Sequence, residues 1–135
     1  MISLKISMIL VGYGIRFWVV WNNPGFNLLI TKPEQIYQKG LYKYIRHPAY
    51  LASLIMCGGV FALCAGWRGG LPAWLVLLVL LSHTARQEEK MLCEGFPGYK
   101  KYMARTGMFL PKVMIFTLAD LQDRLNIFRE SRRRA

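Results

Sequence analysis

The sequence predicts an all-α fold, an integral membrane helical bundle with about three transmembrane helices and a C-terminal interfacial helix, in one domain over 1–135. Two observations carry this prediction. Hydrophobic residues make up 54% of the chain and charged residues 19%, which is rich in apolar residues for a water-soluble domain of this size. The apolar residues also form long runs, and basic residues flank those runs.

The clearest apolar run covers 49–67 and contains no charged residue. A helix of about 19 residues at about 1.5 Å per residue is roughly 28 Å long, close to the hydrocarbon thickness of a bilayer. A second run, over 69–85, is also free of formal charge. The linker "RGG" (68–70) and the nearby Pro72 suit a tight turn between them. We therefore expect two spans, 49–67 and 69–85, that form an antiparallel hairpin.

The N-terminal segment predicts one further span, over about 6–29. Arg16 lies inside its otherwise apolar window, and Asn22, Asn23 and Pro24 follow. A central arginine costs at least ~2.5 kcal/mol on insertion scales unless it snorkels or pairs. A cleavable signal peptide is the alternative, but the segment lacks a clear small-residue cleavage site and its apolar content continues further.

The net charge of +11 suits either nucleic acid or an anionic membrane face. The basic residues gather on both outer flanks of the hairpin and leave Arg68 alone in its turn, so we expect a multi-pass protein whose flanks, including the tail 86–135, face the cytoplasm. Membrane lipids, and not nucleic acid, are then the partners of this charge. The flanking residues are Lys32, Lys39, Lys43 and Arg46 before the hairpin and Arg86, Lys90, Lys100, Lys101 and Arg105 after it.

The cysteines do not predict a metal site. Cys57 and Cys64 are seven residues apart in a predicted span, and Cys93 stands alone in a basic region. Since the usual spacings of metal ligands are missing, we interpret all of them as structural thiols.

The residues at the mouth of the hairpin favour a ligand site. Pro48 fits the first turn of a helix, where its missing N–H costs nothing, and His47 would then be the N-cap residue. The next backbone N–H groups are unpaired at such a terminus and attract an anion, and Arg46 with His47 strengthens that preference. We predict that a ligand carboxylate binds there.

Glu88 and Glu89 are expected to approach His47, because antiparallel spans of similar length return to the same membrane surface. Each pattern alone has an ordinary explanation. An Arg-His-Pro sequence can anchor a span at the interface, and Arg86 and Lys90 can pair with the glutamates. Their occurrence at both ends of one hairpin favours a site with donors for a carboxylate and acceptors for a cation.

The stretch "GLYKYIRHPAYLA" (40–52) resembles the pattern G-x-Y-x-x-x-R-H-P-x-Y-x-G of a known family. This family comprises the small integral-membrane methyltransferases that include isoprenylcysteine carboxyl methyltransferase and phosphatidylethanolamine N-methyltransferase. The later segments "EEKML" (88–92) and "GFPGYKKYMARTGMFLP" (95–111) are similar to the family's glutamate pair and to its F-G-x-x-Y-x-x-Y tail.

This resemblance implies S-adenosylmethionine-dependent methyl transfer to a lipid-like or membrane-delivered acceptor that carries a carboxylate, a thiol or an amine. Glu88 would also accept the proton of an amine acceptor. Arg105 would hold an anionic acceptor group, although a surface arginine that faces phosphates explains it equally well. The residues implied to line the cofactor pocket are Tyr42, His47, Pro48, Ala49 and Tyr50 from the first segment and Glu88 and Glu89 from the second.

Some positions depart from the family pattern. Ala52 replaces a glycine, Thr84 stands where the isoprenylcysteine branch tends to carry arginine, and Met108 stands where a basic residue is common. The expectation of a prenylcysteine carboxylate as acceptor is weaker for that reason. A membrane reductase of the sterol-reductase type with a nicotinamide cofactor and a noncatalytic membrane adaptor are the alternatives to a methyltransferase.

The segment 117–130 predicts the interfacial helix. Its apolar residues recur at 118, 121, 125 and 128, and Thr117 with Asp120 resembles a capping box. We expect this helix to lie on the cytoplasmic membrane surface. Its apolar face would also suit a second copy of the chain, so the sequence leaves a homo-oligomer open.

Overall fold

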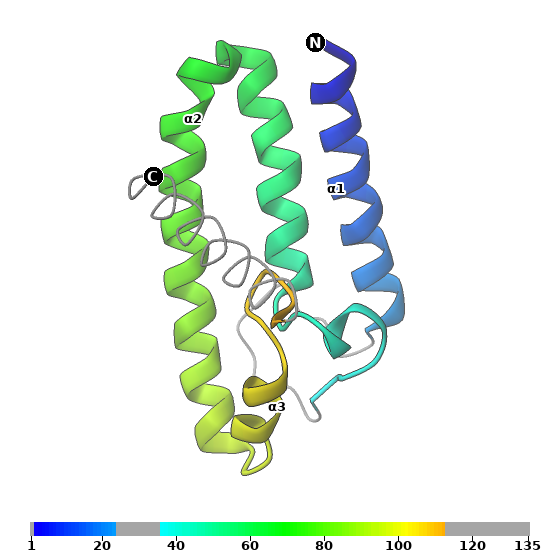
Figure 1. The fold of residues 1–135 in the computed structure, drawn as a ribbon, viewed down its shortest axis with the longest axis vertical. Coiled ribbons are helices and arrows are strands. Elements are labelled where there is room, and N and C mark those ends of the chain that lie inside the picture. Colours follow the sequence, from blue (N-terminus) through cyan, green and yellow to red (C-terminus); the bar gives the residue numbers. More distant parts are fainter. Residues whose placement is uncertain (1, 24–35, 113–135) are drawn as a thin grey trace, which may run out of the picture.

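The computed structural model describes residues 2–23 and 36–112, which fold into helices joined by short connections (Figure 1). The elements are α1 (Ile2–Asn22), the 3-10 helix η1 (Gly40–Lys43), α2 (Pro48–Gly95) and α3 (Tyr99–Arg105). Within these ranges there is no strand, and one isolated parallel bridge joins Ile45 to Gly107. The predicted all-α class is confirmed for this part of the chain. The segment 117–130 lies outside the described residues.

Helix α2 reverses its direction at Gly66 and forms two antiparallel legs, a first leg over 48–65 and a second leg over 67–95 (Figure 1). Gly66 has φ 66° and ψ 173°, a backbone conformation that glycine alone adopts readily. The predicted hairpin is confirmed, but its turn lies just before "RGG" (68–70) and not within it. Pro72 falls near the start of the second leg.

The second leg is longer than the sequence predicts, because the helix continues from the expected end at Ala85 to Gly95. The added residues include good helix formers such as glutamate, lysine, methionine and leucine, and their polarity does not interrupt the helix. The leg ends where Phe96 adopts an extended conformation before Pro97, as the residue before a proline prefers.

Helix α1 lies beside the first leg of α2, and the second leg lies on the other side of that first leg (Figure 1). The helix begins at Ile2 and ends at Asn22, whereas we expected a span over 6–29. The Asn22 side chain donates a hydrogen bond to the carbonyl of Trp18 at 2.9 Å. With Pro24 disfavouring helix in the residue before it, the chain leaves the helix at Asn23.

Glycines bring α1 and the first leg into close contact. A Cβ on Gly12 would lie 2.7 Å from the carbonyl oxygen of Ala52 and from the Cβ of Met56, and a Cβ on Gly59 would lie 2.6 Å from the carbonyl oxygen of Lys5. This interface therefore depends on the missing side chains, as is common where helices pack inside a bilayer.

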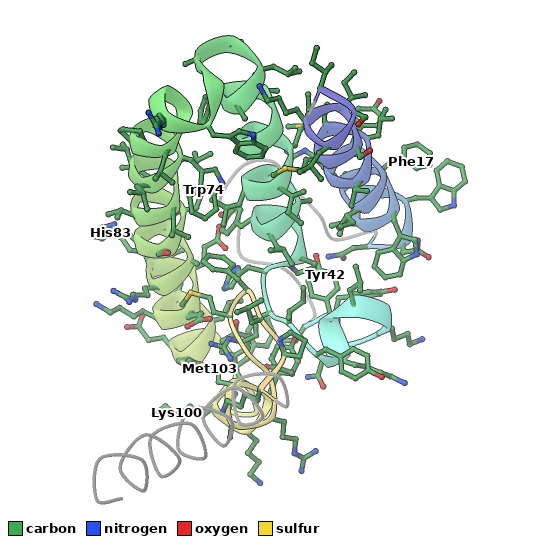
Figure 2. The ribbon with its side chains drawn as sticks, turned by 45° about the horizontal axis from the view of Figure 1, so that its top comes forward. Phe17, Tyr42, Trp74, His83, Lys100 and Met103 are labelled. Atoms are coloured by element: carbon green, nitrogen blue, oxygen red, sulfur yellow. The ribbon has the colours of Figure 1, made fainter. Side chains whose placement is uncertain are left out.

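Polar side chains also join the three long helical segments. Arg16, the charge inside α1, donates a hydrogen bond to the Ser53 hydroxyl of the first leg at 3.1 Å. Trp74 points from the second leg toward the first and donates from Nε1 to the Leu54 carbonyl at 2.8 Å (Figure 2). Both bonds are made by residues whose neighbours along the chain are apolar.

Apolar residues also cover the outer surfaces. Phe17 points away from the helical core (Figure 2), and α1 exposes a large set of hydrophobic side chains. The polar His83 of the second leg also points outward (Figure 2). Among the described residues, α1 and α2 are long enough and apolar enough to cross a membrane, with mean hydropathies of 1.4 and 1.9. The exposed hydrophobic residues of α1 are Ile2, Leu4, Ile6, Leu10, Val11, Tyr13, Phe17, Val20 and Trp21.

Candidate active site

The site is assembled at the open end of the α2 hairpin, where the segment before α2 pairs with the segment after α3. The backbone N–H of Arg46 donates to the Gly107 carbonyl at 2.8 Å, and that of His47 donates to the Met108 carbonyl at 3.1 Å. The N–H of Gly107 donates back to the Tyr44 carbonyl at 3.1 Å. This short parallel pairing brings the residues after α3 against the start of the hairpin.

His47 lies between both glutamates of the second leg. Its Nε2 is 3.1 Å from Glu89 Oε1, and its Nδ1 is 3.6 Å from Glu88 Oε2. The side chains of His47 and Glu89 are each 8% exposed, whereas Glu88 is 26% exposed. The predicted approach of these residues is confirmed, because both legs return to the same end of the molecule. His47 is also the N-cap residue of α2, as predicted, although its side chain forms no cap hydrogen bond.

Arg46 uses its side chain differently from our expectation. Its guanidinium points to Glu89, with Nε 2.6 Å from Oε1, and Nη1 donates to the carbonyls of Met103, at 3.2 Å, and Thr106. We expected Arg46 and His47 to attract a ligand carboxylate, but both bind a carboxylate of the protein itself. A buried carboxylate needs such partners, since its ionised form is otherwise costly away from water.

The Glu89 carboxylate is kept ionised by these contacts. Burial acts to raise its pKa, but the hydrogen bonds and positive charges of His47 and Arg46 outweigh burial, and the pKa lies below its usual value. Both hydrogen bonds reach Oε1. In the part of the chain that the structure describes, Oε2 receives no hydrogen bond. Every fully buried side-chain oxygen in that part has a hydrogen-bond partner, so Oε2 is not one of the fully buried atoms. Oε2 is therefore not fully enclosed, and it can still accept a hydrogen bond.

Aromatic rings surround His47. The Tyr50 ring stacks on the imidazole with centroids 5.4 Å apart, and the Phe109 ring meets it edge-on at 6.4 Å. The Tyr50 hydroxyl donates a hydrogen bond to Glu88 Oε1. Phe109 is a site residue that our sequence analysis did not single out. It lies in the tail "GMFLP" (107–111), which the family resemblance covers, and that was the available signal.

The start of α2 also offers backbone donors. Pro48 and Ala49 are buried, and the N–H of Leu51 is bonded to the His47 carbonyl at 3.1 Å. No acceptor within 2–23 or 36–112 is bonded to the N–H groups of Ala49 and Tyr50. These groups lie at the positive end of the helix dipole, which favours an anion.

Two predicted site residues form no hydrogen bond or ion pair with this cluster in the described part of the chain. Tyr42, labelled in Figure 2, accepts a hydrogen bond on its hydroxyl from Asn23 at 3.2 Å, and its carbonyl accepts one from the Tyr102 hydroxyl at 2.6 Å. Burial raises the pKa of Tyr102 to about 12, so its hydroxyl stays protonated. Arg105 is exposed at the end of α3, and no ion pair joins it to the glutamates in the described part of the chain.

The cluster as a whole suits a zwitterionic ligand. Glu88 and the open oxygen of Glu89 can accept from a cation, and the aromatic faces of Tyr50 and Phe109 can contact one. The N–H groups at the start of α2 can bind a carboxylate. No group of metal-ligating side chains is found among the residues that the structure places, and Cys57, Cys64 and Cys93 are free thiols.

The chain is similar to several known proteins. It is 29% identical over 115 residues to the nickel-cobalt-cadmium resistance protein NccN of Alcaligenes xylosoxydans xylosoxydans, covering 84% of this chain and 49% of NccN. It is 28% identical over 113 residues to the cobalt-zinc-cadmium resistance protein CzcN of Cupriavidus metallidurans, with the same coverage. An uncharacterised protein of Schizosaccharomyces pombe is 31% identical over 81 residues, covering 55% of this chain and 23% of that protein.

The chain thus spans about half of the length of the metal-resistance relatives and less of the third. No solved structure matches it. The family model described as the isoprenylcysteine carboxyl methyltransferase (ICMT) family matches residues 5–94, a range that contains His47, Glu88 and Glu89. As this range is more than half of the chain, the protein belongs to the isoprenylcysteine carboxyl methyltransferase family.

Proposed function

We propose that the protein transfers a methyl group from S-adenosylmethionine to a lipid-like or membrane-delivered acceptor. The observation that carries the proposal is the contact of His47 with both Glu88 and Glu89 at the open end of an apolar hairpin. Family membership supports the reaction class. The acceptor's reactive group is a carboxylate, a thiol or an amine.

The residues at the open end fit the chemistry of this cofactor. S-adenosylmethionine carries an ammonium and a sulfonium, which suit the carboxylates of Glu88 and Glu89 and the ring faces of Tyr50 and Phe109. It also carries a carboxylate, which suits the N–H groups of Ala49 and Tyr50. We assign Tyr42, His47 and Pro48 to the walls of the same pocket, as the family motif implies.

The bound cofactor supplies an already activated methyl group. The protein residues then have to orient the cofactor and the acceptor in line and exclude water. His47 holds the glutamate carboxylates in place, and Glu88, the more exposed of the two, accepts a proton when the acceptor is an amine. We assign Arg105 to an anionic group of the acceptor. Its exposed position at the end of α3 leaves it accessible to such a group.

We also propose the membrane arrangement. Helix α1, the first leg of α2 and the part of its second leg up to residue 85 would be three spans. Residues 86–112 and the N-terminal flank of the hairpin would lie in the cytoplasm, so that the site faces the cytoplasm. The lipid-facing hydrophobic residues of α1 and the exposed basic residues near the open end support this orientation. The acceptor would then arrive from the lipid and the cofactor from water.

Methyl transfer can be tested with membranes that contain the protein. The membranes are incubated with S-adenosylmethionine labelled in its methyl group, and the label is partitioned among lipid, protein and small-molecule fractions. We expect label in the lipid or membrane-protein fraction, and none above background for membranes without the protein. Binding of a nicotinamide cofactor with no binding of S-adenosylmethionine would favour the reductase alternative. If the protein's cellular function survives His47→Ala, the noncatalytic membrane adaptor is favoured.

A further inference from the structure

We propose that Arg46 is a positioning residue that fixes the Glu89 carboxylate and the segment 106–109 in one arrangement for cofactor binding. The inference rests on the proposed function and deepens it. We assign Arg46 a positioning role because its Nε and Nη1 are bonded within the protein, to Glu89 and to the carbonyls of Met103 and Thr106.

Arg46 joins three segments that are far apart in the sequence. Its Nε binds Glu89 near the end of the second leg, 43 residues away. Its Nη1 binds the carbonyls of Met103 and Thr106, in and just after α3. Its backbone N–H binds the Gly107 carbonyl at 2.8 Å. No other residue of the cluster contacts the second leg and both ends of the segment 103–107 within the described ranges.

These bonds determine which atoms remain for a ligand. Arg46 and His47 both bind Glu89 Oε1 and leave Oε2 without a hydrogen bond in the described part of the chain. The pairing of 46–47 with 107–108 also places the Phe109 ring against His47. A single guanidinium thus orients the open oxygen of Glu89 and helps to hold one aromatic wall of the pocket.

Lysine cannot reproduce this arrangement. A guanidinium presents several N–H donors in a planar fork, whereas an ammonium is a compact charge at the end of a flexible chain. A lysine at 46 could contact Glu89 or the carbonyls of Met103 and Thr106, but not all of them in the same geometry. The charge would be kept while the position of the carboxylate would be lost.

Loss of the guanidinium also changes the pH range over which Glu89 is ionised. The titratable groups around Glu89 are Arg46 and His47 at the start of α2, its neighbour Glu88, and Tyr99 and Tyr102 on α3. Arg46 is a main cause of the low pKa of Glu89. Without it the pKa rises, and the carboxylate becomes protonated at a higher pH. As the solution is acidified, the variant therefore loses cofactor binding through ionised Glu89 at a higher pH than the wild type does.

The test measures the affinity of the purified full chain, in lipid nanodiscs, for S-adenosylmethionine over a range of pH. We expect Arg46→Lys and Arg46→Gln to weaken binding roughly 10- to 100-fold, as for the loss of a charged hydrogen bond. Arg46→Gln should also move the acidic limit of binding to higher pH. Arg86→Gln removes the same charge from an exposed position on the second leg and should change neither property.

A double-mutant cycle separates positioning from a merely structural role. If Arg46 acts through Glu89, Arg46→Lys should have little further effect on affinity in the Glu89→Gln background. Wild-type affinity of both Arg46→Lys and Arg46→Gln would overturn the proposal, and so would an unchanged pH profile for Arg46→Gln or fully additive effects in the cycle. Absence of binding by the wild-type protein would instead contradict the proposed function on which the inference rests.

Discussion

The turn end and the open end of the α2 hairpin hold its legs together by different means. At the turn, the reversal depends on the backbone of Gly66, and Gly70 lies so close to Phe61 that a Cβ would come within 2.7 Å of its carbonyl carbon. Arg68, the charge in this region, is exposed. In the described part of the chain, small residues pack closely here and no ion pair joins the legs at this end.

The open end buries charges instead. His47 and Glu89 are 8% exposed and Arg46 is 9% exposed, and all of them lie in a single hydrogen-bonded group. Buried ion pairs are a weak source of stability, because desolvation offsets their attraction. We therefore interpret the charges of the open end as serving binding and chemistry.

The largest expected effect concerns the open end. Glu88→Gln should weaken S-adenosylmethionine binding roughly 10- to 100-fold, because an amide replaces the ionised acceptor of a charged hydrogen bond. Glu94→Gln makes the same change at an exposed position of the same leg and should leave the affinity unchanged. Isothermal titration of both variants measures the difference. Equal binding by both would mean that the open end is not the cofactor site.

The next effect concerns the small-residue contact between α1 and the first leg. Gly12→Ala should destabilise the protein by about 1–3 kcal/mol, since the added methyl group meets backbone atoms of Ala52 and Met56 at 2.7 Å. Gly14→Ala is the control, because nothing lies within 4 Å of its added Cβ, and alanine is the better helix former. Thermal unfolding in detergent compares them. A similar stability for both variants would contradict the close packing at Gly12.

A smaller effect is expected at the turn. Gly66→Ala should lower the free energy of unfolding by about 1–2 kcal/mol, because a φ of 66° with an extended ψ is strained for any residue with a Cβ. Gly95→Ala, at the other end of the second leg, is the control. The φ of Gly95 is not positive, and an added Cβ there would have no neighbouring atom within 4 Å. Chemical denaturation should show a loss for the first variant only, and an unaltered Gly66→Ala protein would place the reversal elsewhere.

The smallest effect concerns the bond between the legs. Trp74→Phe keeps an aromatic ring but loses the hydrogen bond to the Leu54 carbonyl, which should lower stability by about 0.5–1.5 kcal/mol. Trp21→Phe, at a side chain that is 78% exposed, should have no measurable effect. The two unfolding midpoints are compared under identical conditions, and a drop for Trp21→Phe as large as that for Trp74→Phe would argue against the interhelical bond.

Local signals predicted much of the open end. Pro48 fixes the start of α2 and so makes His47 its N-cap, and this follows from the chemistry of two adjacent residues. The similar lengths of two apolar runs were enough to predict that Glu88 and Glu89 approach His47, as they do. Such features depend on short stretches and on helix geometry, which the sequence carries directly.

Other features depend on long-range register and could not be predicted. The partners of Arg46 are set by the pairing of 44–47 with 107–108, for which no periodic pattern exists in the sequence. The reversal at Gly66 was not distinguishable from one at Gly69 or Gly70, because each glycine is equally free to adopt a positive φ. Packing against the neighbouring leg determines which of these glycines adopts the positive φ.

A structure of the protein with S-adenosylhomocysteine, the demethylated form of the cofactor, tests the central claim most directly. We predict one bound molecule at the open end, with its ammonium at about 2.7–3.2 Å from a carboxylate oxygen of Glu88 or Glu89. Its carboxylate should lie at the N–H groups of Ala49 and Tyr50. A ligand at the open end that contacts only one leg of the hairpin would contradict the account, and so would a ligand that lies elsewhere while His47 and the glutamates are bonded only to each other.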